Sequence, residues 1–193
     1  MINSRAIIQK YSSPALWAVI AIYTLILPQA IIVYRDLEAL FGQEAVGKIP
    51  LMGIILIGTL YVVYGYRRNH NFKHLIYLIP SAAIALAIIK SEPNPNKHIH
   101  IPEYILMAWL LYLVLSKRYS GKGLFLLVFL CGSMLGVVDE LQQGLHPKRF
   151  YGWIDMSINS ASTVIGILTI VGLVRSPGGD TETWEWTKYS HMF

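Results

Sequence analysis

The stretch that decides the fold is GLFLLVFLCGSMLGVVDELQQ, residues 123–143. It is apolar over most of its length, and an apolar α-helix of about 20 residues is long enough to span the hydrocarbon core of a bilayer. Four of its residues recur at spacings that place them on one helical face: Gly132, Gly136, Glu140 and Gln143. The stretch therefore predicts a transmembrane helix. One face of this helix has small residues inside the membrane and polar residues at the end of the helix.

The rest of the chain has the same character. Of its 193 residues, 54% are hydrophobic and 14% are charged, compared with about 25% charged residues in an ordinary soluble domain. Segments rich in charge, glycine or proline separate the apolar blocks. The blocks predict six spans, at about 14–34, 49–66, 75–90, 101–118, 123–143 and 155–174. We therefore expect an all-α, polytopic transmembrane bundle that forms one domain over residues 1–175, followed by an aromatic tail over residues 176–193.

The distribution of charge predicts the orientation of this bundle. Six spans place both termini on one side of the membrane, and that side carries ten of the 16 Lys and Arg residues. The opposite side carries the other six, together with eight of the 11 acids. Because cytoplasmic loops are enriched in Lys and Arg, we expect both termini to be cytoplasmic and the acid-rich side to face outward. The net charge of +5 fits membrane lipid headgroups better than nucleic acid, for which the sequence shows no binding module.

The last apolar block begins with a second polar stripe. Four of its residues share a helical face: Asp155, Asn159, Ser162 and Gly166. The stripes of two consecutive antiparallel helices can face each other, with small residues allowing close approach and polar residues meeting at the outer end. Helix packing alone would explain the small residues. The charged residues exceed what a loop needs for solvation, which favours a functional site.

The segment NKHIHIPEY, residues 96–104, lies on the same outer side at the start of the fourth block. His100 and Tyr104 share a helical face there. Pro102 fits the first turn of a helix, because its missing N–H is not needed at that position. We expect His100 to lie near Glu140 at the outer end of the bundle. We call this end the mouth; water would be partly excluded from it, and the two side chains would form an acid/base pair there.

Two further kinds of chemistry are suggested by the polar residues of this mouth. Lys97 and Arg149 would bind the anionic group of a lipid or cell-wall precursor, and Arg149 would present a planar fork of donors. A metal is the alternative, but HxH without a further fixed-spacing motif does not define a metal site. We therefore predict no metal and no cofactor. The metal alternative would use His98, His100, Glu140, His146 and Asp155.

At these positions the chain resembles the VanZ-like family of small polytopic membrane proteins, over about residues 96–170. The family pattern reads D-K-x-x-H-x-x-x-Y, then E-x-x-Q, then a P-x-R-like turn, then D-x-x-x-N-x-x-G. Two residues depart from it. Asn96 stands where the pattern has Asp, which removes a carboxylate, and Ser162 stands where it has Gly. The matching residues are Lys97, His100, Tyr104, Glu140, Gln143, Pro147, Arg149, Asp155 and Asn159.

The resemblance implies an outward-facing polar site in a bacterial plasma membrane, linked in some members of the family to resistance against the glycopeptide antibiotic teicoplanin. Our first hypothesis is a protein that binds, and can modify, an anionic lipid-linked or cell-envelope molecule. Glu140 and His100 would be its acid and base, and the question of enzymatic activity stays open. The binding residues would be Lys97, Tyr104, Gln143, Arg149, Asp155 and Asn159.

The second hypothesis belongs to a different class. It is a non-catalytic accessory subunit of a larger membrane complex, in which the polar cluster is structural. The exposed spans and the C-terminal aromatic residues would dock on other membrane subunits. A transporter is a third alternative, but the charged groups gather at one mouth and not along a path through the membrane.

Overall fold

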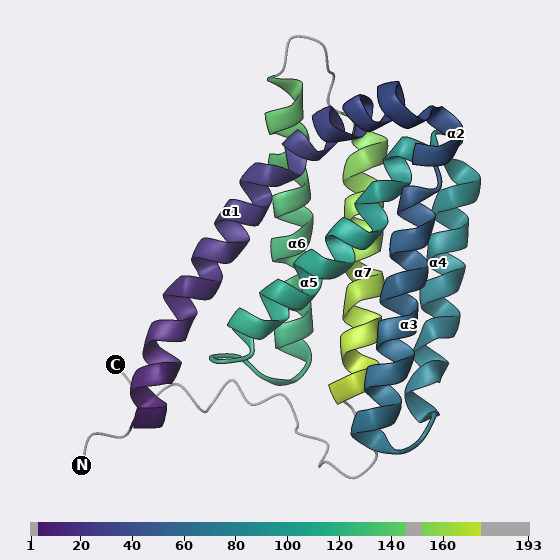
Figure 1. The fold of residues 1–193 in the computed structure, drawn as a ribbon. Coiled ribbons are helices and arrows are strands. Elements are labelled where there is room, and N and C mark those ends of the chain that lie inside the picture. Colours follow the sequence, from purple (N-terminus) through teal and green to yellow (C-terminus); the bar gives the residue numbers. More distant parts are fainter. Residues whose placement is uncertain (1–3, 146–151, 175–193) are drawn as a thin grey trace.

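The protein is described by a computed structural model that covers residues 4–145 and 152–174, and all regular structure within them is helical. Figure 1 shows the long helices side by side in one bundle. The predicted aromatic tail, residues 176–193, lies outside the described residues. The elements are α1 (Ser4–Phe41), α2 (Gln43–Val46), α3 (Ile49–Asn69), η1 (Lys73–Tyr77), α4 (Leu78–Ser91), η2 (Pro95–Ile99), α5 (His100–Leu115), α6 (Gly121–Gly144) and α7 (Trp153–Val174), where η marks a 3₁₀ helix.

Five helical segments within the described residues are long and apolar enough to cross a membrane, and α1 makes a sixth if its two arms count as one span. The prediction of an all-α bundle is therefore confirmed for the described residues, with five or six helices that are long and apolar enough to cross a membrane. The predicted block at 75–90 is lengthened by η1 to 19 residues. The five segments are Gln43–Arg68, Lys73–Ser91, Pro95–Leu115, Gly121–Gly144 and Trp153–Val174.

The first helix is bent. Its two arms, Pro14–Ala30 and Ile32–Phe41, meet at 41°. Pro28 lies within one turn of the bend, and proline disturbs a helix because it lacks an N–H and its ring crowds the preceding turn. The second arm crosses the end of the bundle toward α2 (Figure 1). There the Tyr34 hydroxyl donates a 2.7 Å hydrogen bond to the carbonyl oxygen of Val46, which ties this arm to α2.

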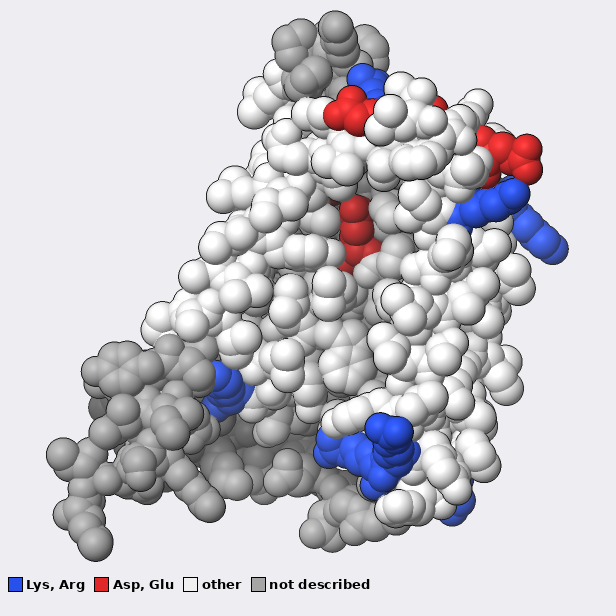
Figure 2. Space-filling model, viewed as in Figure 1, with Lys and Arg blue, Asp and Glu red and all other residues white. Residues whose placement is uncertain are grey.

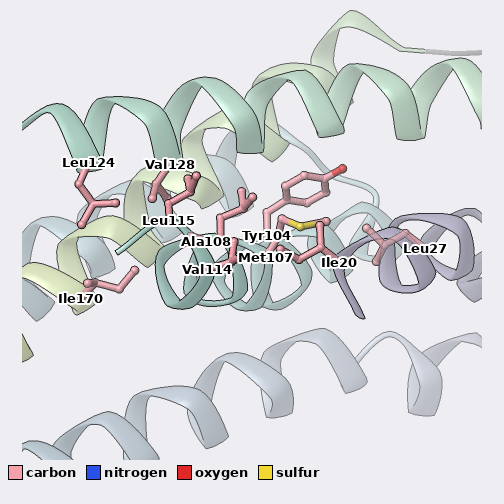
Figure 3. Packing of buried hydrophobic residues seen from close by; sticks show 11 residues of the cluster. Ile20, Leu27, Tyr104, Met107, Ala108, Val114, Leu115, Leu124, Val128 and Ile170 are labelled. Atoms are coloured by element: carbon pink, nitrogen blue, oxygen red, sulfur yellow. The ribbon is translucent and has the colours of Figure 1, made fainter. Parts of the chain in front are cut away.

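Helix α5 forms the centre of the protein. Figure 3 shows its side chains packed against residues of α1, α6 and α7. A second apolar cluster joins α5 to α4 and α7. A helix that is apolar on most of its sides is typical of a buried position, and the sequence of α5 has this property. Five of its residues have no exposed surface: Ile101, Tyr104, Met107, Ala108 and Leu111.

The small residues of α6 face α7, as the sequence predicts. A Cβ atom on Gly132 would lie 2.7 Å from Cγ2 of Thr163. One turn later, a Cβ atom on Gly136 would lie 2.9 Å from Cβ of Asn159. Only glycine allows the two helices to approach this closely at these levels. The close approach brings the polar end of α6 beside the polar start of α7.

Gly166 continues the stripe of α7 but contacts α5. A Cβ atom at this position would lie 2.5 Å from Cβ of Ala108 and 3.0 Å from the carbonyl oxygen of Ile105. The sequence predicts that Gly166 faces the helix at 123–143, so this contact differs from the expectation. The reason is that α7 packs against both α5 and α6. Residues of the same stripe therefore contact different helices.

We expect Gly166→Ala to destabilise the fold by about 1–3 kcal/mol, because the added methyl group meets a short side chain and backbone that cannot move aside. Gly58→Ala in α3 is the matched control, since nothing lies within 4 Å of a Cβ atom there. The control should be neutral or slightly stabilising. Denaturation of both variants in mixed detergent micelles measures the difference, and equal stabilities would contradict the tight α5–α7 contact.

Candidate functional site

The start of α5, the end of α6 and the start of α7 meet at one end of the bundle, the upper end in Figure 1. On the face drawn in Figure 2, acidic residues occur only in the upper half, and the lower end carries Lys and Arg. We call the upper end the acidic end. It holds all acids of the described residues: Asp36, Glu38, Glu44, Glu92, Glu103, Asp139, Glu140 and Asp155.

Lys97 joins two carboxylates from different elements. Its ammonium nitrogen lies 3.2 Å from Oε2 of Glu92 and 3.0 Å from Oδ1 of Asp155. The Lys97 side chain is 30% exposed, and both carboxylate side chains are 10% exposed. Asp155 lies in the first turn of α7, where the helix dipole also favours a negative charge. Lys97 therefore clamps the segment before α5 to the start of α7, and the anion that it is predicted to bind would compete with two ion pairs.

Hydrogen bonds hold the segment between α4 and α5. The backbone N–H of Asn94 donates to Oε1 of Glu92 at 3.0 Å, and Nε2 of His98 lies 2.8 Å from the carbonyl oxygen of Glu92. The side chain of Asn96 donates a 3.0 Å hydrogen bond to Oε1 of Glu38 in α1. Asn96 stands where the family pattern has Asp. Here it acts as a donor to a carboxylate, a role that an ionised Asp does not fill.

A deeper group of polar side chains lies between α5 and α6. Nδ1 of His100 is 3.2 Å from Oε2 of Glu103, one turn later in α5. The Tyr104 hydroxyl donates to Oδ2 of Asp139 at 3.3 Å, and the side-chain amide of Gln143 donates to Oδ1 of Asp139 at 3.0 Å. Asp139 and Tyr104 have no exposed surface. We call these side chains, together with Glu140 and Asn159, the inner cluster.

Glu140 connects the inner cluster to the start of α7. Its Oε2 accepts a 3.1 Å hydrogen bond from the backbone N–H of Gly152, the residue before α7. The side chain is fully buried. The sequence predicts Glu140 beside His100. The structure places Glu103 in contact with His100, whereas Glu140 interacts with His100 electrostatically.

Apart from Nδ1 of His100, which faces Glu103, four buried polar atoms of the inner cluster have no hydrogen-bond partner among the described residues: Oε1 of Glu140, Oε1 of Gln143, and Oδ1 and Nδ2 of Asn159. Asn159 lies beside Tyr104, since its Nδ2 and Cε1 of Tyr104 would both be 3.4 Å from a Cβ atom on Gly136. Buried polar groups in proteins are nearly always paired. These atoms therefore indicate a place where water or the polar groups of a ligand bind.

Seven of the eight predicted site residues belong to the part of the chain that the structure describes, and all seven lie in the two groups above. Arg149 lies outside the described residues, as does His146, and the roles assigned to them stay predictions. Within residues 4–145 and 152–174, no three His, Cys, Asp or Glu side chains are arranged to hold a metal ion.

The structure adds three acids to the predicted set: Glu92, Glu103 and Asp139. Glu103 has a local signal that predicts its contact, because it follows His100 by three residues and such pairs are neighbours on a helix. Asp139 precedes Glu140 and points to a different side of α6, where it meets Tyr104 of α5. Glu92 has no local signal, because its contact with Lys97 depends on the turn between α4 and η2.

The inner cluster is suited to exchanging protons and to binding positive charge. Three of its carboxyl groups, those of Glu103, Asp139 and Glu140, lie largely out of water, and all three interact with His100. Buried carboxylates at short range cannot all be ionised without protons or cations to balance them. The cluster can therefore hold protons or accept a cationic group from a ligand.

The outer ion pairs predict a dependence of stability on pH. Burial raises the pKa of Glu92, but the Asn94 N–H and the Lys97 ammonium lower it more, so that it lies below the usual value of 4.5. A lowered pKa stabilises the fold above the usual pKa, and this stabilisation is lost as the pH falls through the lowered value. We expect Glu92→Gln to lower the unfolding temperature at about pH 7, and this effect to shrink as the pH falls through the lowered pKa.

Thermal unfolding of the two proteins in detergent across this pH range measures the difference. Glu44→Gln is the control, because the Glu44 side chain is 91% exposed and exposed ion pairs contribute little. An effect of Glu92→Gln that stays constant from neutral to acidic pH would contradict the role of its charge.

We compared the chain with models of protein families, with curated proteins and with solved structures, and none of them matched.

Proposed function

We propose that this chain is a VanZ-like integral protein of the bacterial plasma membrane that binds an anionic, lipid-linked molecule of the cell envelope at its acidic end and exchanges protons with it. One observation carries the proposal. The buried carboxyl groups of Asp139 and Glu140 and the largely buried one of Glu103 gather with His100 at a single end of a bundle of apolar helices. Ionisable groups inside membrane helices are costly, and proteins usually keep them for function.

The geometry suggests a division of tasks. Glu140 has one oxygen held by the Gly152 N–H and the other without a partner among the described residues, so it can accept or deliver a proton. His100, paired with Glu103, would act on the same proton or on a neighbouring one. Tyr104, Gln143 and Asn159 supply hydrogen bonds that orient the ligand.

The anionic group of the ligand would be bound mainly by Arg149. Lys97 already has Glu92 and Asp155 within ion-pair distance. A cation that is paired in this way contributes less binding free energy to a third anion. The planar guanidinium of Arg149 matches the two oxygens of a phosphate or carboxylate. In this proposal Lys97 and Asp155 position the start of α7, which precedes the inner cluster residue Asn159.

The orientation forms part of the proposal. The loops and helix ends opposite the acidic end carry Arg67, Arg68, Lys73, Lys117, Arg118 and Lys122. By the positive-inside rule this basic end faces the cytoplasm, together with both termini, and the acidic end faces outward. An envelope molecule would then reach the inner cluster from the outer leaflet.

A second candidate function is that of an accessory subunit in a larger membrane complex. The supporting observation is that only 17% of the apolar window in Gln43–Arg68 and 22% of that in Lys73–Ser91 are buried within the chain. These helices leave wide apolar surfaces for lipid or for another subunit. In that case the inner cluster would be structural.

The proposed orientation can be tested with single cysteines. Cys131 is the one cysteine of the chain, so Cys131→Ser provides a cysteine-free background. In that background we expect Glu44→Cys to react with a membrane-impermeant maleimide in intact cells. Ser120→Cys, at the opposite end of the bundle, should react only after the cells are permeabilised. The reverse pattern would refute the orientation.

The proposed binding site can be tested with Glu140→Gln and Arg149→Ala. We expect each to reduce the lipid that copurifies with the protein about tenfold, the effect of losing about 1.4 kcal/mol of binding free energy. We also expect each to abolish any protection that the protein gives against teicoplanin. Glu44→Gln, at the same end but exposed, should change neither. Lipid is measured by mass spectrometry and protection by growth of expressing cells.

If both variants fold, as judged by their elution in mild detergent, and retain lipid and protection, the proposed function is wrong. Purification in the same detergent also separates the two candidates. A companion protein present in stoichiometric amounts, with no effect of Glu140→Gln, would favour the accessory subunit.

A further inference from the structure

The connection between α3 and η1 lies at the basic end of the bundle, the lower end in Figure 1. One apolar segment ends at Arg68 and the next begins at Lys73, so that only residues 69–72 separate them. His70 ends α3 in the left-handed conformation, with a φ of 50°, and its N–H donates a 2.8 Å hydrogen bond to the carbonyl oxygen of Tyr66. A connection this short holds residues 66–73 at the surface of the bilayer. We call residues 66–73 the basic turn.

Two stacked aromatic rings fix the shape of the basic turn. The ring centroids of Tyr66 and Phe72 lie 4.9 Å apart, with 21° between the ring planes. Both residues are exposed, Tyr66 by 47% and Phe72 by 59%, and such aromatic residues at the end of a transmembrane helix are typical of the headgroup region. The stack brings the end of α3 beside the start of η1. A basic residue follows each ring in the sequence, Arg67 after Tyr66 and Lys73 after Phe72.

The basic turn carries positive charge that no carboxylate of the described residues offsets. Arg67, Arg68 and Lys73 are all exposed. The Arg68 guanidinium donates a 3.2 Å hydrogen bond through Nη1 to the hydroxyl of Tyr64, one turn earlier in α3, which holds it along the helix. The sequence has no Asp or Glu in residues 45–91, and the acids of the described residues lie at the opposite, acidic end. An anion from outside the described part of the chain would therefore meet cations without competing carboxylates.

The protein surface next to the basic turn is apolar. The apolar window of Gln43–Arg68 is 17% buried within the chain, and that of Lys73–Ser91 is 22% buried. The exposed apolar side chains nearest to the turn in sequence are Val63 of α3 and Ile76 of η1, and Ile79 of α4 follows. The turn and its surroundings thus combine positive charge at the depth of lipid headgroups with apolar surface at the depth of acyl chains.

We propose that the basic turn binds the phosphate of an anionic phospholipid, whose acyl chains pack on the exposed faces of α3 and α4. The planar guanidinium groups of Arg67 and Arg68 match the oxygens of the phosphate, and the Lys73 ammonium adds a further positive charge. The site lies at the end of the bundle opposite the inner cluster. It involves none of the residues of the proposed function and does not depend on that function.

Other occupants fit the basic turn less well. A zwitterionic phospholipid carries an ammonium group beside its phosphate, and the cations of the turn repel this group. A soluble anion lacks the apolar part that would cover the exposed faces of α3 and α4. The proposal therefore implies a preference for anionic lipid that depends on the basic turn and not on the net charge of the protein.

The test uses the full chain, stripped of lipid in mild detergent and reconstituted in nanodiscs made from equal amounts of phosphatidylglycerol and phosphatidylcholine. After extraction into the same detergent, the retained lipids are quantified by mass spectrometry. We expect the wild-type protein to retain phosphatidylglycerol over phosphatidylcholine by about tenfold. Arg67→Gln and Lys73→Gln should each lower this ratio about fivefold, because each removes one positive charge at the membrane surface. Lys73→Arg keeps the charge and should retain most of the preference.

Two exposed lysines provide matched controls. Lys122→Gln removes the same charge at the basic end, but from the first turn of α6, which Figure 1 shows apart from α3. Lys90→Gln removes it at the acidic end, from the last turn of α4. Both variants should leave the lipid ratio unchanged. Inorganic phosphate, added in large excess during the extraction, should also leave the retained phosphatidylglycerol in place, because free phosphate has no acyl chains.

Each contrary outcome overturns the proposal. If the wild-type protein retains both lipids equally, the basic turn does not select anionic lipid. If Lys122→Gln lowers the ratio as much as Lys73→Gln does, the preference follows net charge and the turn is not the site. If Arg67→Gln and Lys73→Gln keep the full preference, or if inorganic phosphate displaces the lipid, the assigned phospholipid site is wrong. The lipid ratio of the wild-type protein decides even if a variant does not fold.

Discussion

The close contact between α5 and α7 at Gly166 is the constraint on which the rest of the structure depends. Without a Cβ atom at this position, α7 approaches the backbone of α5 at Ile105, one turn from the polar start of α5. The same stripe of α7 meets α6 at Gly136 through Asn159. Dispersion forces between closely packed helices replace the hydrophobic effect inside a bilayer. Three helices held in this way must bring their polar ends to one place.

That placement explains why polar groups can be buried so deeply. Three carboxylates of the acidic end find partners outside their own helix: Lys97 reaches Asp155, Tyr104 reaches Asp139 and the N–H of Gly152 reaches Glu140. These contacts stabilise the charged ends of the helices, but they leave Asn159 and one oxygen of Glu140 without partners among the described residues. A purely structural cluster would be expected to satisfy such atoms internally. These unpaired polar atoms are therefore the physical basis for proposing a ligand.

The two polar groups of the acidic end differ in character, and this difference organises the proposed chemistry. In the outer group both carboxylates have a cationic partner, because the Lys97 ammonium lies within ion-pair distance of Glu92 and of Asp155. The inner cluster is dominated by acids and lies against the core of α5. The outer group thus suits positioning, since its ion pairs fix the turn before α5 to the start of α7. The inner cluster suits exchange of protons, since its carboxyl groups lie largely out of water close to His100.

The sequence by itself determined the class of the protein and the location of its polar end. Apolar blocks of bilayer length predict the helices, and the period of an α-helix places Gly132, Gly136 and Glu140 on one face, because both properties are local to a segment of chain. Only the tertiary structure decided the partners. Lys97 meets Glu92 and Asp155, and His100 meets Glu103 and not Glu140, because these contacts depend on how α5 is rotated between its neighbours and on the turn before it. The contacts of α1 with α5 and η2, through Tyr23 and Glu38, are likewise long-range and set by the tertiary structure.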